Sequence, residues 1–136
     1  MDFKRVTLAD LPILEQMLAE YNGKICDISP GNLVMWRDYY EISYWYDGTG
    51  YAIRFGNMDG MTCYYCPSSM TDALLEALGG EGTLTCLCAE EVAYLQERFA
   101  CGEAIHERDW DDYLYEIAPF LTLGGKRFHG QRNHVN

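Results

Sequence analysis

The sequence predicts an α+β domain with a mixed, mostly antiparallel sheet that is flanked by helices. Three observations predict this class. First, apolar residues recur at helical spacing near the start of the chain. Second, two runs with alternating aromatic residues lie on either side of a short turn. Third, helix-like and strand-like segments follow one another in the rest of the chain. The 136 residues, of which 49% are hydrophobic, suffice for one domain with a buried core. We expect this domain over residues 1–123 and a basic C-terminal helix over 124–136.

The first predicted helix begins near Thr7 and ends before Gly23. Thr7 and Asp10 have the spacing of a capping box, and Pro12 falls in the first turns, where a missing N–H matters least. The apolar face recurs at helical spacing through Leu11, Leu14, Leu18 and Tyr21. A turn at Pro30 and Gly31 then precedes a second, short helix, for which Asn32 is the expected cap.

A hairpin and a third strand are expected next. The aromatic runs over residues 41–46 and 51–55 alternate around Asp47-Gly48-Thr49-Gly50, which is turn chemistry. A third strand over residues 61–66 follows the turn at 57–60 and ends at Pro67.

The second half alternates helices and strands. One helix is expected after Ser69, which forms a capping box with Asp72, and it ends at Gly79. A buried strand over residues 83–89 and a helix over 90–102 follow. Residues 104–117 are strand-like, although their apolar positions also fit a helix, and residues 125–136 fit a helix.

The charge distribution is asymmetric. The net charge is −11; residues 1–123 carry seven Lys or Arg against 21 Asp or Glu, hence −14, and residues 124–136 carry +3. Such a body does not attract a polyanion broadly, so a phosphate partner would have to meet a local basic site. The predicted anion-binding residues are Lys126, Arg127, Arg132 and Asn133. A plain polar helix whose cations complement its dipole explains the same residues equally well.

The cysteine pairs and the acidic segment each have a functional and a purely structural interpretation. Two cysteine pairs could hold zinc, but free, buried thiols are the favoured interpretation, and we expect no metal site at Cys63, Cys66, Cys86 and Cys88. We expect the acidic segment to be solvated. Asp112, which lies between aromatic residues, is its one candidate for acid–base catalysis. The acidic residues of this segment are Glu103, Glu107, Asp109, Asp111, Asp112 and Glu116.

The N-terminus lacks the apolar segment of a signal peptide, and no apolar run has the length of a membrane span. We therefore expect a cytoplasmic protein. No phosphate-binding glycine loop, nucleophile elbow or zinc-protease motif occurs, and we expect no cofactor.

The C-terminal stretch resembles a known signature. Residues 112–115, Leu121, Leu123, 125–129 and 132–136 resemble the pattern of a bacterial family of unassigned function, which is related to the C-terminal domain of phosphatidylglycerol lysyltransferases. Residues 27–36 and 64–67 are similar to two earlier motifs of that family. Three positions depart from it: Cys26 stands for Ser, Ser69 for Gly and Gln131 for Lys.

The resemblance implies an N-acetyltransferase-like fold that occurs as a tandem pair, as in the Fem-type peptidoglycan aminoacyltransferases. This chain would be the N-terminal half of an aminoacyl-tRNA-dependent transferase, inactive alone, that acts on a small-molecule or lipid-headgroup acceptor. The expected partner is charged tRNA through a second domain. Asp112 and His129 are the catalytic candidates, and a non-catalytic ligand- or protein-binding module is the alternative.

The resemblance also implies self-association. A C-terminal helix without its second domain should expose Phe128 and Val135. Exposed apolar side chains on a helix favour pairing with another copy, so we expect a homodimer through this helix.

Overall fold

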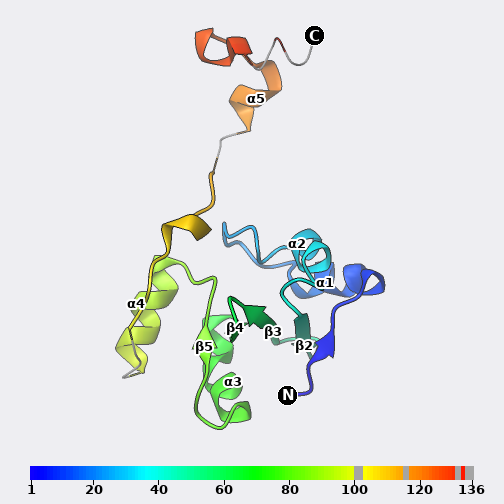
Figure 1. Cartoon of the computed structure of the whole chain (residues 1–136), viewed down its shortest axis with the longest axis vertical. Helices are drawn as coiled ribbons and strands as arrows, with labels where there is room; N and C mark the ends of the chain where they lie inside the picture. Colours follow the sequence, from blue (N-terminus) through cyan, green and yellow to red (C-terminus); the bar gives the residue numbers. More distant parts are fainter. Residues whose placement is uncertain (100–102, 115–116, 131–132, 134–136) are drawn as a thin grey trace. The chain divides into compact units, whose positions relative to one another are not determined.

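The computed structural model describes residues 1–99, 103–114, 117–130 and 133. The chain forms two compact units, residues 1–106 and 107–136, which are described separately. The division lies between His106 and Glu107, whereas the sequence predicts it after residue 123. Figure 1 shows the order of the elements along the chain.

The first unit is built on a five-stranded sheet. In sheet order the strands are β1 (Lys4–Arg5), β2 (Ile42–Tyr46), β3 (Tyr51–Met58), β4 (Met61–Tyr65) and β5 (Thr83–Leu84). All neighbouring strands are antiparallel except β4 and β5, which are parallel. The predicted α+β class with a mixed, mostly antiparallel sheet is confirmed.

The β2–β3 hairpin and the third strand are confirmed. Oδ1 of Asp47 accepts hydrogen bonds from the backbone N–H of Thr49 at 2.9 Å and of Gly50 at 2.8 Å. Gly48 adopts a φ of +99°, a backbone conformation that would be strained for a residue with a side chain. The local turn residues therefore fix the register in which Tyr46 lies opposite Tyr51.

Helix α1 (Leu11–Met17) follows a turn of 3-10 helix, η1 (Leu8–Asp10). The predicted pairing at its start is present, because Oδ2 of Asp10 accepts from the backbone N–H and the hydroxyl of Thr7 at 2.8 and 2.7 Å. The helix ends at Met17, before the predicted Leu18 and Tyr21. Tyr21 therefore belongs to the loop that follows.

Helix α2 (Pro30–Met35) has a different N-cap residue from the predicted one. The hydroxyl of Ser29 accepts from the backbone N–H of Asn32 at 3.4 Å, so Ser29, not Asn32, caps the helix. Pro30 and Gly31 lie inside the first turn rather than in a separate turn. A proline is favourable there, since its nitrogen would have no helical partner.

Helices α3 (Thr71–Ala77) and α4 (Ala89–Arg98) flank β5 in the sequence, as predicted in type and order. Ser69 does not cap α3 but lies in a 3-10 turn, η2 (Ser68–Met70). The predicted strand over 83–89 is wrong beyond Leu84, since Cys86 has a φ of +56° that breaks strand geometry.

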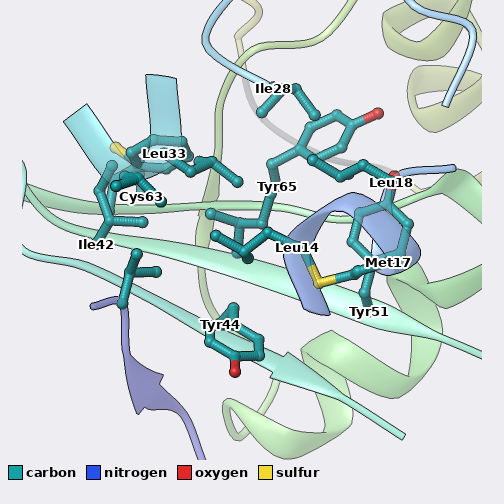
Figure 2. Packing of buried hydrophobic residues seen from close by; sticks show 14 of the residues in the cluster. Leu14, Met17, Leu18, Ile28, Leu33, Ile42, Tyr44, Tyr51, Cys63 and Tyr65 are labelled. Atoms are coloured by element: carbon teal, nitrogen blue, oxygen red, sulfur yellow. The ribbon is translucent and has the colours of Figure 1, made fainter. Parts of the chain in front are cut away.

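The core lies on both faces of the sheet. One face packs against α1 and α2 through the larger cluster, part of which Figure 2 shows, and which includes Leu14, Leu33, Ile53 and Tyr65. The other face holds a smaller cluster of Ala52, Cys66 and Leu74. Successive residues of β3 and of the β4 segment alternate between the clusters, as the period of two in a strand requires.

The second unit contains η3 (Arg108–Trp110), α5 (Ala118–Thr122) and η4 (Lys126–Phe128). Residues 104–114 thus form one 3-10 turn and neither a strand nor a longer helix. The expected exposure of Phe128 is wrong: its side chain is 5% exposed and its ring lies 5.3 Å from that of Phe120. Val135 lies outside the described residues, and a homodimer through this segment stays a prediction.

Candidate functional site

A groove with a volume of 690 Å³ opens in the first unit. Four segments line it: the end of α1 with the loop to Ile25, the β2–β3 turn, the residues after β4, and the first turn of α4. It lies beside the carboxyl ends of the parallel strands β4 and β5. Its size suits a small organic molecule. We call it the tyrosine groove, since Tyr21, Tyr46, Tyr51 and Tyr65 line it.

Tyr65 and Glu91 meet in this groove. Tyr65 ends β4, and its hydroxyl donates to Oε1 of Glu91 at 3.3 Å. The other carboxylate oxygen of Glu91 accepts from the backbone N–H of Cys88 at 2.9 Å. That second bond fixes Glu91 in the first turn of α4, because it satisfies an N–H group that has no partner within the helix.

Tyr51 lies beside Tyr65, and both side chains are almost fully buried. The ring centroids are 6.4 Å apart, and the hydroxyl ends of both residues lie on the same side of the cluster in Figure 2. Burial raises the pKa of Tyr51 to about 12. Burial, together with the charge of Glu91, raises the pKa of Tyr65 above the usual range of a tyrosine. Both hydroxyls therefore stay protonated at neutral pH.

Tyr21 completes the aromatic wall from the opposite segment. Its ring meets that of Tyr65 edge to face, with centroids 6.1 Å apart and an interplanar angle of 84°. The ring folds back over Gly23, where an added Cβ would lie 2.2 Å from it. Glycine at this position is therefore a steric requirement for the observed ring position.

The groove carries more negative than positive charge. Glu20 and Glu91 line it together with one cation, Lys24. Residues 1–106 carry six Lys or Arg against sixteen Asp or Glu, hence −10. The field in and around the groove therefore favours cations over anions.

The arrangement offers three kinds of chemistry. The Glu91 carboxylate can accept a proton or hold a positive charge. The protonated tyrosine hydroxyls can donate or accept hydrogen bonds, and their rings can pack against apolar or cationic groups.

The predicted anion-binding residues lie in the second unit. Lys126 and Arg127 are exposed in η4, and the guanidinium carbon of Arg127 lies 4.5 Å from the ring centroid of Phe128. Asn133 is exposed, and Arg132 lies outside the described residues. The structure brings Lys126 and Arg127 into one turn, and their role in anion binding stays a prediction.

The two predicted catalytic candidates belong to the second unit, where Asp112 and His129 are exposed. The described residues that line the tyrosine groove come from positions 16–91 of the first unit. In the acidic segment Glu103, Glu107 and Asp111 are exposed as expected, whereas Glu116 and the side chain of Asp109 lie outside the described part of the chain.

The five cysteines within the described residues are free thiols and lie in different environments. Cys63 belongs to the larger core cluster and Cys66 to the smaller one, so they lie on opposite faces of the sheet, as the strand period predicts. They cannot share one metal ion or form a redox pair. Cys26 and Cys88 are exposed, and Cys101 lies outside the described residues. Within the described ranges, no three His, Cys, Asp or Glu side chains gather as a metal site.

The sequence does not identify the groove residues as a site. Tyr65 lies within the motif at 64–67, which indicates no role for its side chain, and the pattern around Glu91 predicts only a helix. The one signal for Glu91 is its position three residues after Cys88, at the start of α4. Nothing local in the sequence links it to Tyr65, 26 residues earlier.

Among the residues that the structure describes, no helix has the length and apolar character needed to cross a membrane.

No protein-family model matches the chain, and no curated protein matches it. The chain is similar in structure to a conserved protein of unknown function from Bacteroides thetaiotaomicron VPI-5482, with a TM-score of 0.76 and 24% sequence identity. The match covers 100% of this chain and 49% of that chain, so this chain spans about half the length of the solved structure. At this identity the similarity shows a shared fold.

Proposed function

We propose that the chain forms one half of an acyltransferase-like protein, related to the aminoacyl-tRNA-dependent transferases that its C-terminal motif resembles. The tyrosine groove would hold the acceptor, a small molecule or a lipid headgroup. The observation that carries this proposal is the hydrogen bond from buried Tyr65 to Glu91 inside a groove of 690 Å³. The parallel pair β4–β5 beside this groove is compatible with an N-acetyltransferase-like fold.

The proposed reaction assigns Glu91 as the proton acceptor. The acceptor nitrogen or oxygen attacks the acyl carbon of the aminoacyl ester, and a new bond forms as the ester C–O bond to the tRNA ribose breaks. The proton of the neutral acceptor passes to the Glu91 carboxylate, which then gives it to the departing ribose oxygen. The ribose therefore leaves as a hydroxyl, and Glu91 is ionised again. Tyr65 positions the carboxylate through its hydrogen bond.

The donor side of the proposal involves the second unit. Lys126, Arg127, Arg132 and Asn133 would meet phosphate or carboxylate groups of the donor. The charge of −10 on residues 1–106 opposes extensive tRNA contact by the first unit, so charged tRNA would bind mainly through a second domain. A cytoplasmic location, where charged tRNA occurs, and a homodimer through the C-terminal segment belong to the same proposal.

The second candidate is a non-catalytic module that binds a ligand in the same groove. The exposure of Asp112 and His129 favours it over an enzyme that uses these two residues in a buried active site. Reading the gene beyond Asn136 separates the candidates. A second, similar domain supports the transferase, and its absence supports the module.

A mobility-shift and transfer experiment tests the transferase. The protein, with any domain encoded after Asn136, is mixed with tRNA charged with a labelled amino acid and with a simple primary amine as acceptor. We expect a shifted complex and transfer of label to the amine. Lys126→Ala with Arg132→Ala should abolish the shift, and Glu91→Gln should abolish transfer but keep the shift. Transfer that is unchanged in Glu91→Gln contradicts the assignment.

The matched control is Glu90→Gln. It removes the same charge from the neighbouring position, but Glu90 does not line the groove. We expect its transfer rate to equal that of the parent protein.

A further inference from the structure

We propose that the tyrosine groove binds the primary ammonium group of a small organic molecule. This inference rests on the proposed function, because it names the chemical class of the acceptor, an amine. It concerns recognition in the groove and is tested by binding rather than by transfer.

The aromatic wall is the first argument. Tyr21, Tyr51 and Tyr65 come from three separate segments and converge on one groove, with neighbouring ring centroids 6.1 and 6.4 Å apart. Tyr51 and Tyr65 are buried beneath its surface, so the half-buried ring of Tyr21 is the one of these three that a ligand reaches most directly. Aromatic rings have electron-rich faces that attract organic cations, and groups of such rings are a recurrent means of binding ammonium ligands. Aliphatic side chains of the same volume would not provide this attraction.

The carboxylate is the second argument. Oε1 of Glu91 accepts from the hydroxyl of Tyr65, and Oε2 accepts from the backbone N–H of Cys88. The Cys88 thiol also interacts with this carboxylate. Because the two carboxylate oxygens together offer four acceptor positions, at least one stays available for a ligand. An ammonium group carries three N–H donors, for which this carboxylate and a tyrosine hydroxyl offer acceptors. Among the described residues, no ion pair involves Glu91.

The surrounding charge is the third argument. Glu20 adds a second carboxylate to the groove, and the unit as a whole carries −10, which attracts cations and repels carboxylates and phosphates. Lys24 also lines the groove and opposes this trend. Its charge acts on Glu90, whose pKa is lowered first by a backbone hydrogen bond, then by Cys88 and also by Lys24. The two carboxylates of the groove still outnumber its one lysine.

An organic cation fits better than a metal ion. Within the described ranges no three metal-ligating side chains gather, and tyrosine rings offer a hard cation no ligands. The groove volume of 690 Å³ also leaves room for an organic body beside the charged group.

The test compares three probes of one shape and different charge: n-butylammonium, n-butanol and n-butyrate. Binding to the whole chain at pH 7 is followed through the ring signals of ¹³C-labelled tyrosine. We expect n-butylammonium to bind about tenfold more tightly than either of the other probes. Glu91→Gln should reduce this preference to about twofold or less, whereas Glu90→Gln should retain it.

The outcomes separate the inference from the proposed function. Equal binding of the three probes, or a preference that survives in Glu91→Gln, overturns the inference and leaves the groove as a ligand site. Failure of all three probes to bind overturns both. If Glu91→Gln does not fold, the comparison of the three probes on the parent protein still tests whether the groove prefers the ammonium group. Tyr65→Phe, which keeps the ring but removes the hydrogen bond to Glu91, then serves as the second variant.

Discussion

The hydroxyl of Tyr65 donates to Oε1 of Glu91 over 3.3 Å and so joins the end of β4 to the first turn of α4. The two residues are 26 positions apart in the sequence. The bond connects the sheet to a helix at the edge of the tyrosine groove. It therefore contributes both to the stability of the first unit and to the shape of the proposed site.

Removal of this bond should have a measurable cost. Tyr65→Phe keeps the buried ring but removes the hydroxyl, so we expect the free energy of unfolding to fall by about 1 kcal/mol. Urea denaturation followed by circular dichroism measures it. Tyr64→Phe is the matched control, since Tyr64 packs on the other face of the sheet and lies outside the groove. Equal effects of the two substitutions would show that the hydrogen bond contributes nothing specific.

The position of Tyr21 should depend on Gly23. Gly23→Ala places a Cβ 2.2 Å from the Tyr21 ring, which must then move. We expect the ring signals of Tyr21 and Tyr65 to shift and binding of n-butylammonium to weaken several-fold. Gly31→Ala is the control, because a Cβ at Gly31 meets no atom within 4 Å and alanine favours the helix that contains it. Retained affinity in Gly23→Ala would contradict the assigned role of the Tyr21 ring.

The stability of the first unit should depend on pH through Asp10. Burial alone would raise the pKa of this carboxyl, but hydrogen bonds from Lys4, Thr7 and Tyr44 outweigh burial and hold the pKa at about 2. Because the folded pKa is below the unfolded value of 3.8, the contribution is complete above pH 4 and is lost as the pH falls towards 2. The shift corresponds to about 2 kcal/mol.

Urea unfolding at several pH values measures this contribution. We expect the parent protein to lose about 2 kcal/mol between pH 5 and pH 2 beyond the loss seen in Asp10→Asn. Asp38→Asn is the control, since the side chain of Asp38 is 78% exposed and should leave the pH dependence nearly unchanged. Identical pH profiles for the parent protein and Asp10→Asn would disprove the role of Asp10.

The thiols should react in an order set by burial. Burial raises the pKa of Cys66 to about 11 and that of Cys86 to about 12, so little thiolate is present at pH 8. Cys26 is exposed. We expect iodoacetamide to label Cys26 in minutes and Cys63 and Cys66 only after unfolding, as mass spectrometry of peptides can show. Rapid labelling of Cys66 in the folded protein would contradict its buried position.

Local patterns predicted the parts of the fold that local chemistry decides. The β2–β3 hairpin was predictable because Asp47 and Gly48 form a turn without help from distant residues. The cap of α2 was assigned to Asn32 rather than Ser29, because both residue types cap helices and the choice depends on the backbone around Pro30. The extent of β5 was overestimated, since an apolar run does not reveal the left-handed conformation of Cys86.

Local sequence patterns could not predict the candidate site. Tyr21, Tyr51, Tyr65 and Glu91 lie in four segments that only the tertiary fold brings together. The sequence instead drew attention to Lys126 and Arg127, whose charges stand out locally in an acidic chain. Charge contrast is visible in a sequence, whereas a groove formed by tyrosine rings and carboxylates from separate segments is visible only in the structure.

The most direct measurement of the central claim, that the tyrosine groove is the ligand site, is the position of the shifted tyrosine signals when n-butylammonium is added. We predict that the ring signals of Tyr21, Tyr51 and Tyr65 move in a saturable way and that those of Tyr39 and Tyr64, which lie outside the groove, do not. Saturable shifts confined to Tyr39, Tyr64 or other tyrosines outside the groove, or no saturable shift at all, would contradict the claim.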